Sequence, residues 1–194
     1  MIVGLTGGIG SGKTYVAGLF EAMGVPIYIA DTEAKKLMNS NSAVKKSIID
    51  LFGVEAYQND VLNKKFIADQ VFENKLLLND LNAIVHPAVA AHFQDWYNSQ
   101  KFDFVIKESA ILFETEGYKK CDKTILVIAP ENIRIKRVMK RDQISEAQVR
   151  ARINNQWSDE RKKKLADYVV NNIDKFYVKK KVNELFLAFK RDFI

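Results

Sequence analysis

One run of eight residues near the start of the chain constrains the fold more than any other. It reads Gly7-Gly8-Ile9-Gly10-Ser11-Gly12-Lys13-Thr14 and matches the phosphate-binding motif G-x-x-x-x-G-K-[ST]. In this motif the glycines let successive backbone N–H groups curl around phosphate oxygens. The lysine reaches the β- and γ-phosphates, and the hydroxyl after it ligates Mg²⁺. We refer to residues 7–14 as the phosphate loop.

The segments on either side of the phosphate loop have the patterns that the motif requires. Residues 1–6 are apolar and partly β-branched, which predicts a buried strand. Residues 13–23 carry apolar side chains at helical spacing, and Gly24 follows where a helix C-cap glycine belongs. This context favours a nucleotide site over an incidental glycine-rich turn. The residues that we expect to hold ATP here are Gly8, Gly10, Ser11, Gly12, Lys13, Thr14 and Tyr15.

Length and composition favour a single domain in the cytoplasm. A chain of 194 residues matches one domain, and 47% hydrophobic residues suffice for a buried core. The single cysteine, Cys121, excludes an internal disulfide and fits a reducing cytoplasm. No apolar run approaches the length of a membrane span, so we expect no membrane partner.

The net charge of +6 indicates an anionic partner, either nucleic acid or a phosphorylated small molecule. Two lysine runs, at residues 162–164 and 179–181, resemble a nucleic-acid patch. Both lie in helical patterns, and neither has interleaved aromatic residues on which bases would stack. We therefore interpret both runs as solvated helix faces and expect no nucleic-acid partner.

Five short apolar segments alternate with helical patterns along the chain. They predict strands at residues 1–6, 25–30, 102–109, 123–129 and 167–171. The continuous apolar run at 123–129 is typical of a parallel strand covered on both faces. The expected fold is therefore an α/β, three-layer phosphate-loop NTPase fold with a five-stranded parallel sheet.

Residues 39–100 differ from the rest, with four helical patterns and no convincing strand. We expect a helical insertion here that binds the acceptor, with residues 1–38, 101–136 and 158–194 forming the core. The fourth helix is expected to begin at Pro87, since proline suits the first helical position. His86 before it is expected to cap that helix or contact substrate, because no Cys or carboxylate cluster suggests a metal site.

Three acidic residues follow predicted strands, at the sheet edge where ligands bind in parallel α/β proteins. Asp31 follows the second strand and is either a site residue or the N-cap of a helix over residues 32–38. Glu108 stands near the end of the third strand, where phosphate-loop enzymes place the acidic residue that holds Mg²⁺. Glu114 follows and is expected to serve instead or to orient substrate. For Glu108 and Glu114 the alternative is a surface carboxylate at a strand end.

A pair of basic helices follows the fourth strand. Pro130 is expected to start the first, which carries arginines at i, i+3 and i+7, and the capping box at residues 145–148 begins the second. We expect residues 137–157 to form a small lid whose arginines stabilise charge on the transferred phosphoryl group. The alternative is a salt-bridged helix surface. The arginines concerned are Arg134, Arg137 and Arg141 on the first helix and Arg150 and Arg152 on the second.

A phosphate loop predicts nucleotide binding but not a reaction. A GTPase switch would need N-K-x-D after a strand, and neither Asn63-Lys64 nor Asn74-Lys75 has the aspartate or follows a predicted strand. A nucleic-acid-linked ATPase would usually need a longer chain. The short chain, the insertion and the lid favour a small-molecule kinase, with a nucleoside or nucleotide kinase as the alternative acceptor class.

A series of motifs along the whole chain resembles the dephospho-coenzyme A kinase family. Two departures are Thr14 in place of the commoner serine and Ala110-Ile111 where the family usually has proline before its Leu-Leu-Phe-Glu. After the phosphate loop, the motifs that carry the resemblance are Ile29-Ala30-Asp31, His86-Pro87, Ile111-Leu112-Phe113-Glu114, Arg137-x-x-x-Arg141-Asp142, Gln156 and Ala166-Asp167-Tyr168-Val169-Val170-Asn171.

The resemblance implies transfer of the ATP γ-phosphoryl group to the ribose 3′-hydroxyl of dephospho-coenzyme A, the last step of coenzyme A synthesis. It implies that Asp31 is the general base. The nucleotide and metal would be bound by the loop residues and by Glu108 or Glu114. From their place at the end of the fifth strand, Asn171-Asn172 could contact the base of a nucleotide or could simply make the turn. We expect a monomer or weak homo-oligomer. The remaining residues implied are Lys13, Arg137 and Arg141 at the γ-phosphoryl group and His86, Leu112 and Glu114 at the acceptor.

Overall fold

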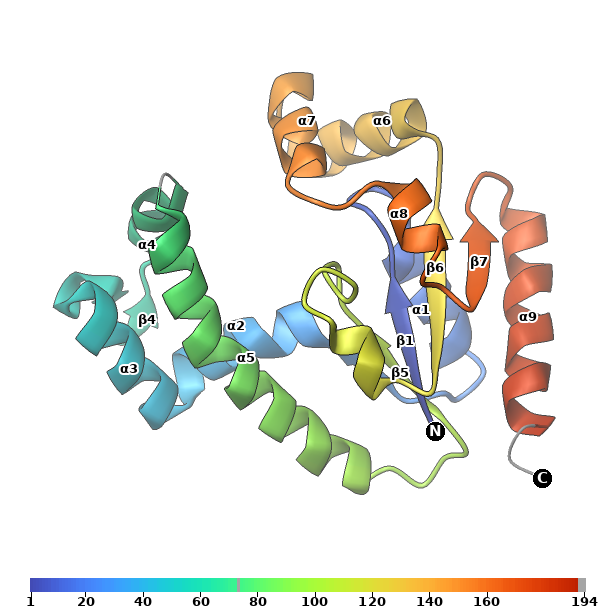
Figure 1. The fold of residues 1–194 in the computed structure, drawn as a ribbon, viewed down its shortest axis with the longest axis horizontal. Helices are drawn as coiled ribbons and strands as arrows, with labels where there is room; N and C mark the ends of the chain where they lie inside the picture. Colours follow the sequence, from blue (N-terminus) through green and yellow to red (C-terminus); the bar gives the residue numbers. More distant parts are fainter. Residues whose placement is uncertain (73, 192–194) are drawn as a thin grey trace. The chain divides into compact units, whose positions relative to one another are not determined.

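The computed structural model describes residues 1–72 and 74–191 and contains a five-stranded parallel sheet (Figure 1). The strand order is β2-β5-β1-β6-β7, and each neighbouring pair is parallel. The predicted α/β fold is confirmed. The strands are shorter than the apolar segments that predict them, because pairing ends where a neighbour stops supplying backbone partners. They are β1 (Ile2–Thr6), β2 (Ile27–Ile29), β5 (Val105–Glu108), β6 (Lys123–Ile128) and β7 (Tyr168–Asn171).

Helices cover both faces of this sheet, which explains its continuous apolar runs. Helix α1 (Lys13–Glu21) lies behind the sheet in Figure 1 and packs against α9 (Lys175–Arg191), whereas the short α8 (Asp159–Lys163) lies in front of β6. The core between the sheet, α1 and α9 is mostly aliphatic and includes a cluster of phenylalanine rings. Phe104 meets Phe20 and Phe189 edge-to-face, with ring centroids 6.3 and 5.4 Å apart. The last three residues of the predicted core segment 158–194 lie outside the described residues.

Helices α6 (Glu131–Asp142) and α7 (Glu146–Asn154) pack on each other through a small apolar cluster of Ile135, Val138 and Val149. Pro130 is the N-cap of α6. The capping box at Ser145 is confirmed, since both of its reciprocal hydrogen bonds are present. Ile9 of the phosphate loop packs against the same cluster, so these helices contact the loop directly.

Residues 30–99 form a compact unit of their own, separate from the unit formed by Met1–Ile29 and the chain from Gln100 onward. This second unit begins at Ala30, earlier than the insertion boundary predicted near residue 39, because its first helix packs on its fourth and second. Its core contains Val44, Ile48 and Ile67. Its elements are α2 (Ala30–Ser40), α3 (Ser42–Phe52), the 3-10 turn η1 (Val54–Ala56), β3 (Tyr57–Gln58), β4 (Val61–Leu62), α4 (Lys64–Phe72) and α5 (Lys75–Asn98).

The prediction that a new helix begins at Pro87 is wrong, because α5 continues through it from Lys75 to Asn98. Proline cannot donate the helical hydrogen bond at that position. Buried Val85, Val89 and Phe93 nevertheless follow one another at intervals of four residues on both sides of the proline. Burial of this continuous stripe holds the helix together across the missing bond.

The sequence also predicts no strand in residues 39–100, whereas β3 and β4 form a short antiparallel hairpin. Its two-residue turn consists of Asn59 and Asp60, which adopt φ of 48° and 65°. A type I′ turn needs positive φ at both positions, and Asn and Asp tolerate it best after glycine. The Asn-Asp pair is thus the local signal for this hairpin.

The first unit also contains the 3-10 turn η2 (Gly117–Lys120), between β5 and β6. Of the helices within residues 1–72 and 74–191, none combines the length and the apolar character needed to span a bilayer.

Candidate functional site

The phosphate loop connects β1 to α1, as predicted, and its backbone has the conformation of an anion cradle. Gly10 and Gly12 adopt φ of 79° and 95°, on either side of Ser11. Alternating left-handed and ordinary conformations turn successive N–H groups toward one side. A Cβ at Gly12 would clash with Nδ2 of Asn172, and one at Gly10 would lie 2.6 Å from the Arg134 carbonyl oxygen. Only glycine therefore fits where α6 and the end of β7 approach the loop.

Helix α1 begins directly after this cradle. Its N-cap is Gly12, which has no capping side chain, and its first turn contains no acidic residue. A helix start of this kind attracts anions through its partial positive charge. Thr14 is exposed at this helix start, whereas Tyr15 is half-buried and packs against the core.

The Lys13 ammonium is close to the one acidic residue predicted at the end of the third strand. Lys13 Nζ donates to the Gly7 carbonyl oxygen at 3.0 Å and lies 3.8 Å from Glu108 Oε1. Glu108 is the last residue of β5 and is level with Leu5 of β1. Both side chains are largely buried, at 13% and 8% exposure. The structure thus brings together a cation and a carboxylate that lie 95 positions apart in the chain.

The predicted arginines separate into two that contact the loop, Arg134 and Arg137, and three on the surface. Arg137 Nη1 lies 3.4 Å from the carbonyl oxygens of both Gly10 and Ser11. Arg141 is 62% exposed and pairs with Asp142 at 2.7 Å, a hydrogen bond that raises the pKa of Arg141 and lowers that of Asp142. Arg150 pairs with Glu131 and Glu146, and Arg152 with Asp142, so the salt-bridged alternative describes Arg141, Arg150 and Arg152.

The peptide groups of Ile9 are held by Arg134, one of the predicted arginines, and by Gln156, which has no predicted role. Arg134 is 6% exposed, and its Nε donates to the Ile9 carbonyl oxygen at 2.9 Å. Gln156 Oε1 accepts the Ile9 N–H at 2.8 Å. Gln156 belongs to the motifs that carry the resemblance, but nothing in the sequence indicates that its partner is the loop backbone.

Of the two asparagines at the end of β7, Asn172 contacts the phosphate loop. Asn171 is the last residue of β7 and is exposed. Asn172 is 5% exposed, and its Nδ2 donates to the Ser11 carbonyl oxygen at 2.8 Å. Successive side chains of a strand point to opposite faces, so only one member of the Asn-Asn pair can meet the loop.

Comparison with known protein families complements the geometry of the phosphate loop. The family model described as "CoaE: Dephospho-CoA kinase" matches residues 1–176. The chain belongs to the dephospho-CoA kinase family. The resemblance drawn from its motifs is therefore confirmed, and as a member of this family the chain is a nucleotide-using transferase of coenzyme A biosynthesis.

Individual relatives agree with the family assignment. A dephospho-CoA kinase of Salinibacter ruber is 42% identical over 174 residues, covering 88% of this chain and 87% of the relative. The crystal structure of TT1252 from Thermus thermophilus has a TM-score of 0.89 at 31% identity and covers 97% of this chain and 96% of its own. The dephospho-CoA kinase from Campylobacter jejuni shares the fold, with a TM-score of 0.71 at 22% identity over 100% of this chain and 98% of its own.

One family motif residue, Glu114, is engaged in a buried ion pair in this dephospho-CoA kinase family member. Its Oε1 lies 2.7 Å from Nζ of Lys162 and accepts the Trp157 N–H at 3.0 Å. Lys162 is fully buried, so the interpretation of residues 162–164 as a solvated face is wrong for this residue. The cause is that α8 packs on β6, which turns one of three consecutive lysines inward. Lys163 and Lys164 are exposed.

The remaining residues implied by the family resemblance lie in different surroundings. Leu112 is 2% exposed and packs beside Gly4, where an added Cβ would approach its Cδ2 to 2.6 Å. Asp31 is exposed in the first turn of α2, two residues after β2 ends, and is not the N-cap because the helix already begins at Ala30. His86 lies on α5, and burial lowers the pKa of its imidazole.

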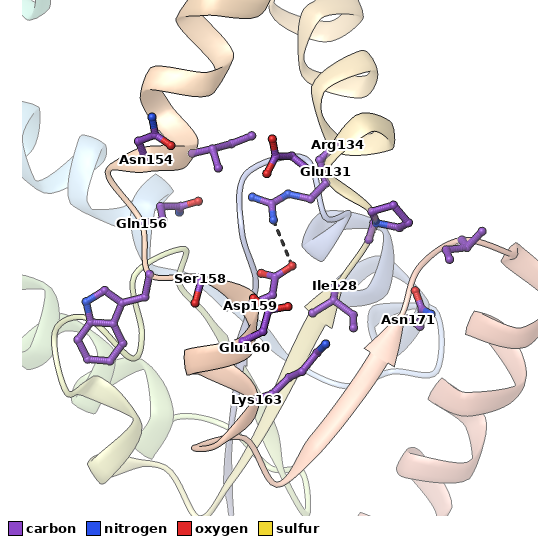
Figure 2. Close-up of a pocket in the computed structure, with 15 residues that line it drawn as sticks. Ile128, Glu131, Arg134, Asn154, Gln156, Ser158, Asp159, Glu160, Lys163 and Asn171 are labelled. Carbon is purple, nitrogen blue, oxygen red and sulfur yellow. Dashed lines mark hydrogen bonds and ion pairs between the residues drawn. The ribbon is translucent and has the colours of Figure 1, made fainter.

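A cavity of about 670 Å³ lies between the ends of β6 and β7, the start of α6 and residues 153–163 (Figure 2). Its walls are polar and carry charges of both signs. Arg134 Nη1 and Asp159 Oδ2 form an ion pair there at 3.1 Å, drawn as a dashed line in Figure 2. Because Arg134 also holds Ile9, the wall of this cavity is connected to the phosphate loop.

Proposed function

We propose that this chain transfers the γ-phosphoryl group of ATP to the ribose 3′-hydroxyl of dephospho-coenzyme A, giving coenzyme A and ADP. The observation that carries the proposal is the phosphate loop with Lys13 beside Glu108, in a chain that belongs to this kinase family. A nucleoside or nucleotide kinase would use the same loop, but the family match disfavours it.

The donor would be bound by the loop. In the proposal, backbone N–H groups of residues 8–15 hold the phosphates, and Lys13 exchanges its contact with the Gly7 carbonyl oxygen for the β- and γ-phosphate oxygens. Arg137 is positioned on the loop to neutralise charge that develops on the γ-phosphoryl group. Arg141 would have to leave Asp142 to contribute, and Asn171 would contact the nucleotide base.

The side chains near the loop fit Mg²⁺ as the metal. Mg²⁺ prefers oxygen ligands, keeps several waters and uses only one or two protein groups besides the phosphates. Within residues 1–72 and 74–191 no three Asp, Glu, His or Cys side chains cluster as a metal cage. The Thr14 hydroxyl and the Glu108 carboxylate would hold the ion. When bound, it supplies positive charge to the phosphate oxygens.

On the acceptor side, Asp31 would accept the proton of the attacking hydroxyl, and His86, Leu112 and Glu114 would bind the acceptor. A loose transition state for phosphoryl transfer demands little of the base, so orientation of the hydroxyl by Asp31 is the larger part of its role. Since Glu114 is paired with Lys162 and Leu112 is buried, these two would act mainly by shaping the loop after β5.

We propose that the enzyme works in the cytoplasm as a monomer or weak homo-oligomer. The single cysteine supports this location. Burial raises the pKa of the Cys121 thiol to about 11, so this group stays protonated and unreactive at neutral pH.

A coupled assay of ADP release tests the proposed reaction. The purified chain with ATP and Mg²⁺ is expected to release ADP when dephospho-coenzyme A is added, and not with shikimate, nucleosides or nucleoside monophosphates. Mass analysis of the product distinguishes coenzyme A from the starting material. ADP release with a nucleoside monophosphate but not with dephospho-coenzyme A would overturn the assignment.

Replacing Asp31 by asparagine is expected to lower kcat by more than about tenfold while ATP still binds. The amide keeps the size of the carboxylate but cannot accept the proton or orient the hydroxyl as strongly. The same change at Asp50, an exposed residue of α3 paired with Lys46, is the matched control and should leave kcat unchanged. Near-normal turnover of the Asp31→Asn variant would remove Asp31 from the mechanism.

A further inference from the structure

We infer that Asn172 is a positioning residue that orients the phosphate-binding peptide groups of the loop. This role rests on the proposed function, because it concerns how the loop receives the phosphates of ATP. The sequence motif does not include Asn172, which lies 161 positions from its contact at Ser11.

Three successive carbonyl groups of the loop are held by side chains from distant parts of the chain. The Ile9 oxygen accepts from Arg134 Nε at 2.9 Å, and the Gly10 oxygen lies 3.4 Å from Arg137 Nη1. The Ser11 oxygen accepts from Asn172 Nδ2 at 2.8 Å, the shortest of the three. The carbonyl side of the loop is therefore fixed from outside.

Fixing a carbonyl group also fixes the N–H group of the same peptide. In a trans peptide the C=O and N–H bonds point in opposite directions. Because Asn172 holds the Ser11 oxygen, the N–H of Gly12 points away from Asn172. The contact of Arg134 with the Ile9 oxygen directs the Gly10 N–H in the same manner. Together with the left-handed conformations of Gly10 and Gly12, this exposes their N–H groups to a bound phosphate.

Asn172 is itself held rigidly enough to act in this way. Its backbone N–H donates to the Ile128 carbonyl oxygen at 2.8 Å, and its own carbonyl oxygen accepts from Arg137 Nη2 at 3.0 Å. Its side chain is 5% exposed and reaches the loop only because Gly12 has no Cβ. One residue thereby positions both the Ser11–Gly12 peptide and the guanidinium of Arg137.

The amide of Asn172 is a neutral donor to the Ser11 oxygen, beside Arg137, whose Nη1 lies 3.4 Å from the same oxygen. An amide donates a hydrogen bond to the Ser11 oxygen without adding charge. An aspartate has the same shape, but its carboxylate would face the carbonyl oxygen and repel the phosphates. Asn172→Asp therefore removes the donor while keeping the volume, and Asn172→Ala removes the group altogether.

Calorimetric titration with tripolyphosphate and with ATP, together with steady-state kinetics, tests this role. For Asn172→Ala the Kd of both ligands should rise about tenfold or more, and for Asn172→Asp it should rise further. KM for ATP should rise, whereas KM for dephospho-coenzyme A should stay the same. The matched controls Asn183→Ala and Asn183→Asp, on the exposed side of α9, should change none of these constants.

The outcomes separate this inference from the proposed function. If the wild-type protein fails to bind ATP or tripolyphosphate, the proposed function itself is wrong. If the wild type binds them and folded Asn172→Asp binds them equally well, or if KM rises in parallel for both substrates, Asn172 has no positioning role. A measurement on the wild type avoids any loss of folding. Once calorimetry has shown that tripolyphosphate binds, the amide resonances of Gly10 and Gly12 should shift when it is added, and unchanged resonances under saturation would contradict the inferred orientation.

Discussion

Replacing Lys13 by alanine will lower kcat for phosphoryl transfer to dephospho-coenzyme A by a factor on the order of 10³. Lys13 Nζ lies within the loop region, 3.0 Å from the Gly7 carbonyl oxygen. It is the one side-chain cation of the phosphate-loop motif. In an enclosed site of low dielectric constant, its charge stabilises the transferred phosphoryl group more strongly than it would in water. Coupled ADP release at saturating ATP measures the effect.

The control for this prediction is Lys179→Ala, which removes an exposed lysine from α9 and should leave kcat unchanged. Thermal unfolding of both variants checks that the fold is kept. Removing Lys13 also leaves Glu108 without the cation 3.8 Å away, so a small loss of stability is expected as well. Wild-type turnover without Lys13 would show that the loop is not a phosphoryl-transfer site.

Replacing Lys162 by alanine will lower the free energy of unfolding by about 3–5 kcal/mol. Lys162 is fully buried and lies 2.7 Å from Glu114, which is itself only 13% exposed. The substitution leaves a buried carboxylate without its counter-charge, which costs far more than breaking a surface pair. Urea unfolding followed by circular dichroism at neutral pH measures the change.

The neighbouring lysine provides the matched control. Lys164→Ala removes an exposed side chain of the same run and should change the free energy of unfolding by less than about 0.5 kcal/mol. A double variant, Lys162→Met with Glu114→Leu, should recover much of the lost stability, because an apolar pair leaves no buried charge. Equal stabilities of the Lys162 and Lys164 variants would mean that the pair contributes nothing.

The parts of the fold that could be predicted depend on local patterns. The strand, glycine loop and helix at the start of the chain follow from three adjacent patterns that agree. The strand at residues 123–129 follows from a continuous apolar run, which needs cover on both faces. That Lys13 and Glu108 lie close together could be expected because each stands at a definable place, one in a motif and the other near a strand end.

The predictions that failed concern positions where the local sequence allows two conformations or environments almost equally well. Pro87 favours a helix start, yet burial of Val85 and Val89 on either side of it keeps α5 continuous. Three consecutive lysines look alike in the sequence, and only the packing of α8 on β6 selects Lys162 for burial. The hairpin at Asn59 and Asp60 is too short for a periodic pattern to reveal it.

The site also divides into features that follow from local sequence patterns and features that packing decides. By itself, the sequence determined the parallel α/β fold, the position of the phosphate loop and the family, because these depend on residues adjacent in the chain or on motifs in a set order. Only the tertiary structure decided that Arg137 rather than Arg141 lies on the loop, and that Asn172 rather than Asn171 holds Ser11. The physical reason is that such contacts depend on which face of a helix or strand meets the loop, and packing between distant segments decides that face.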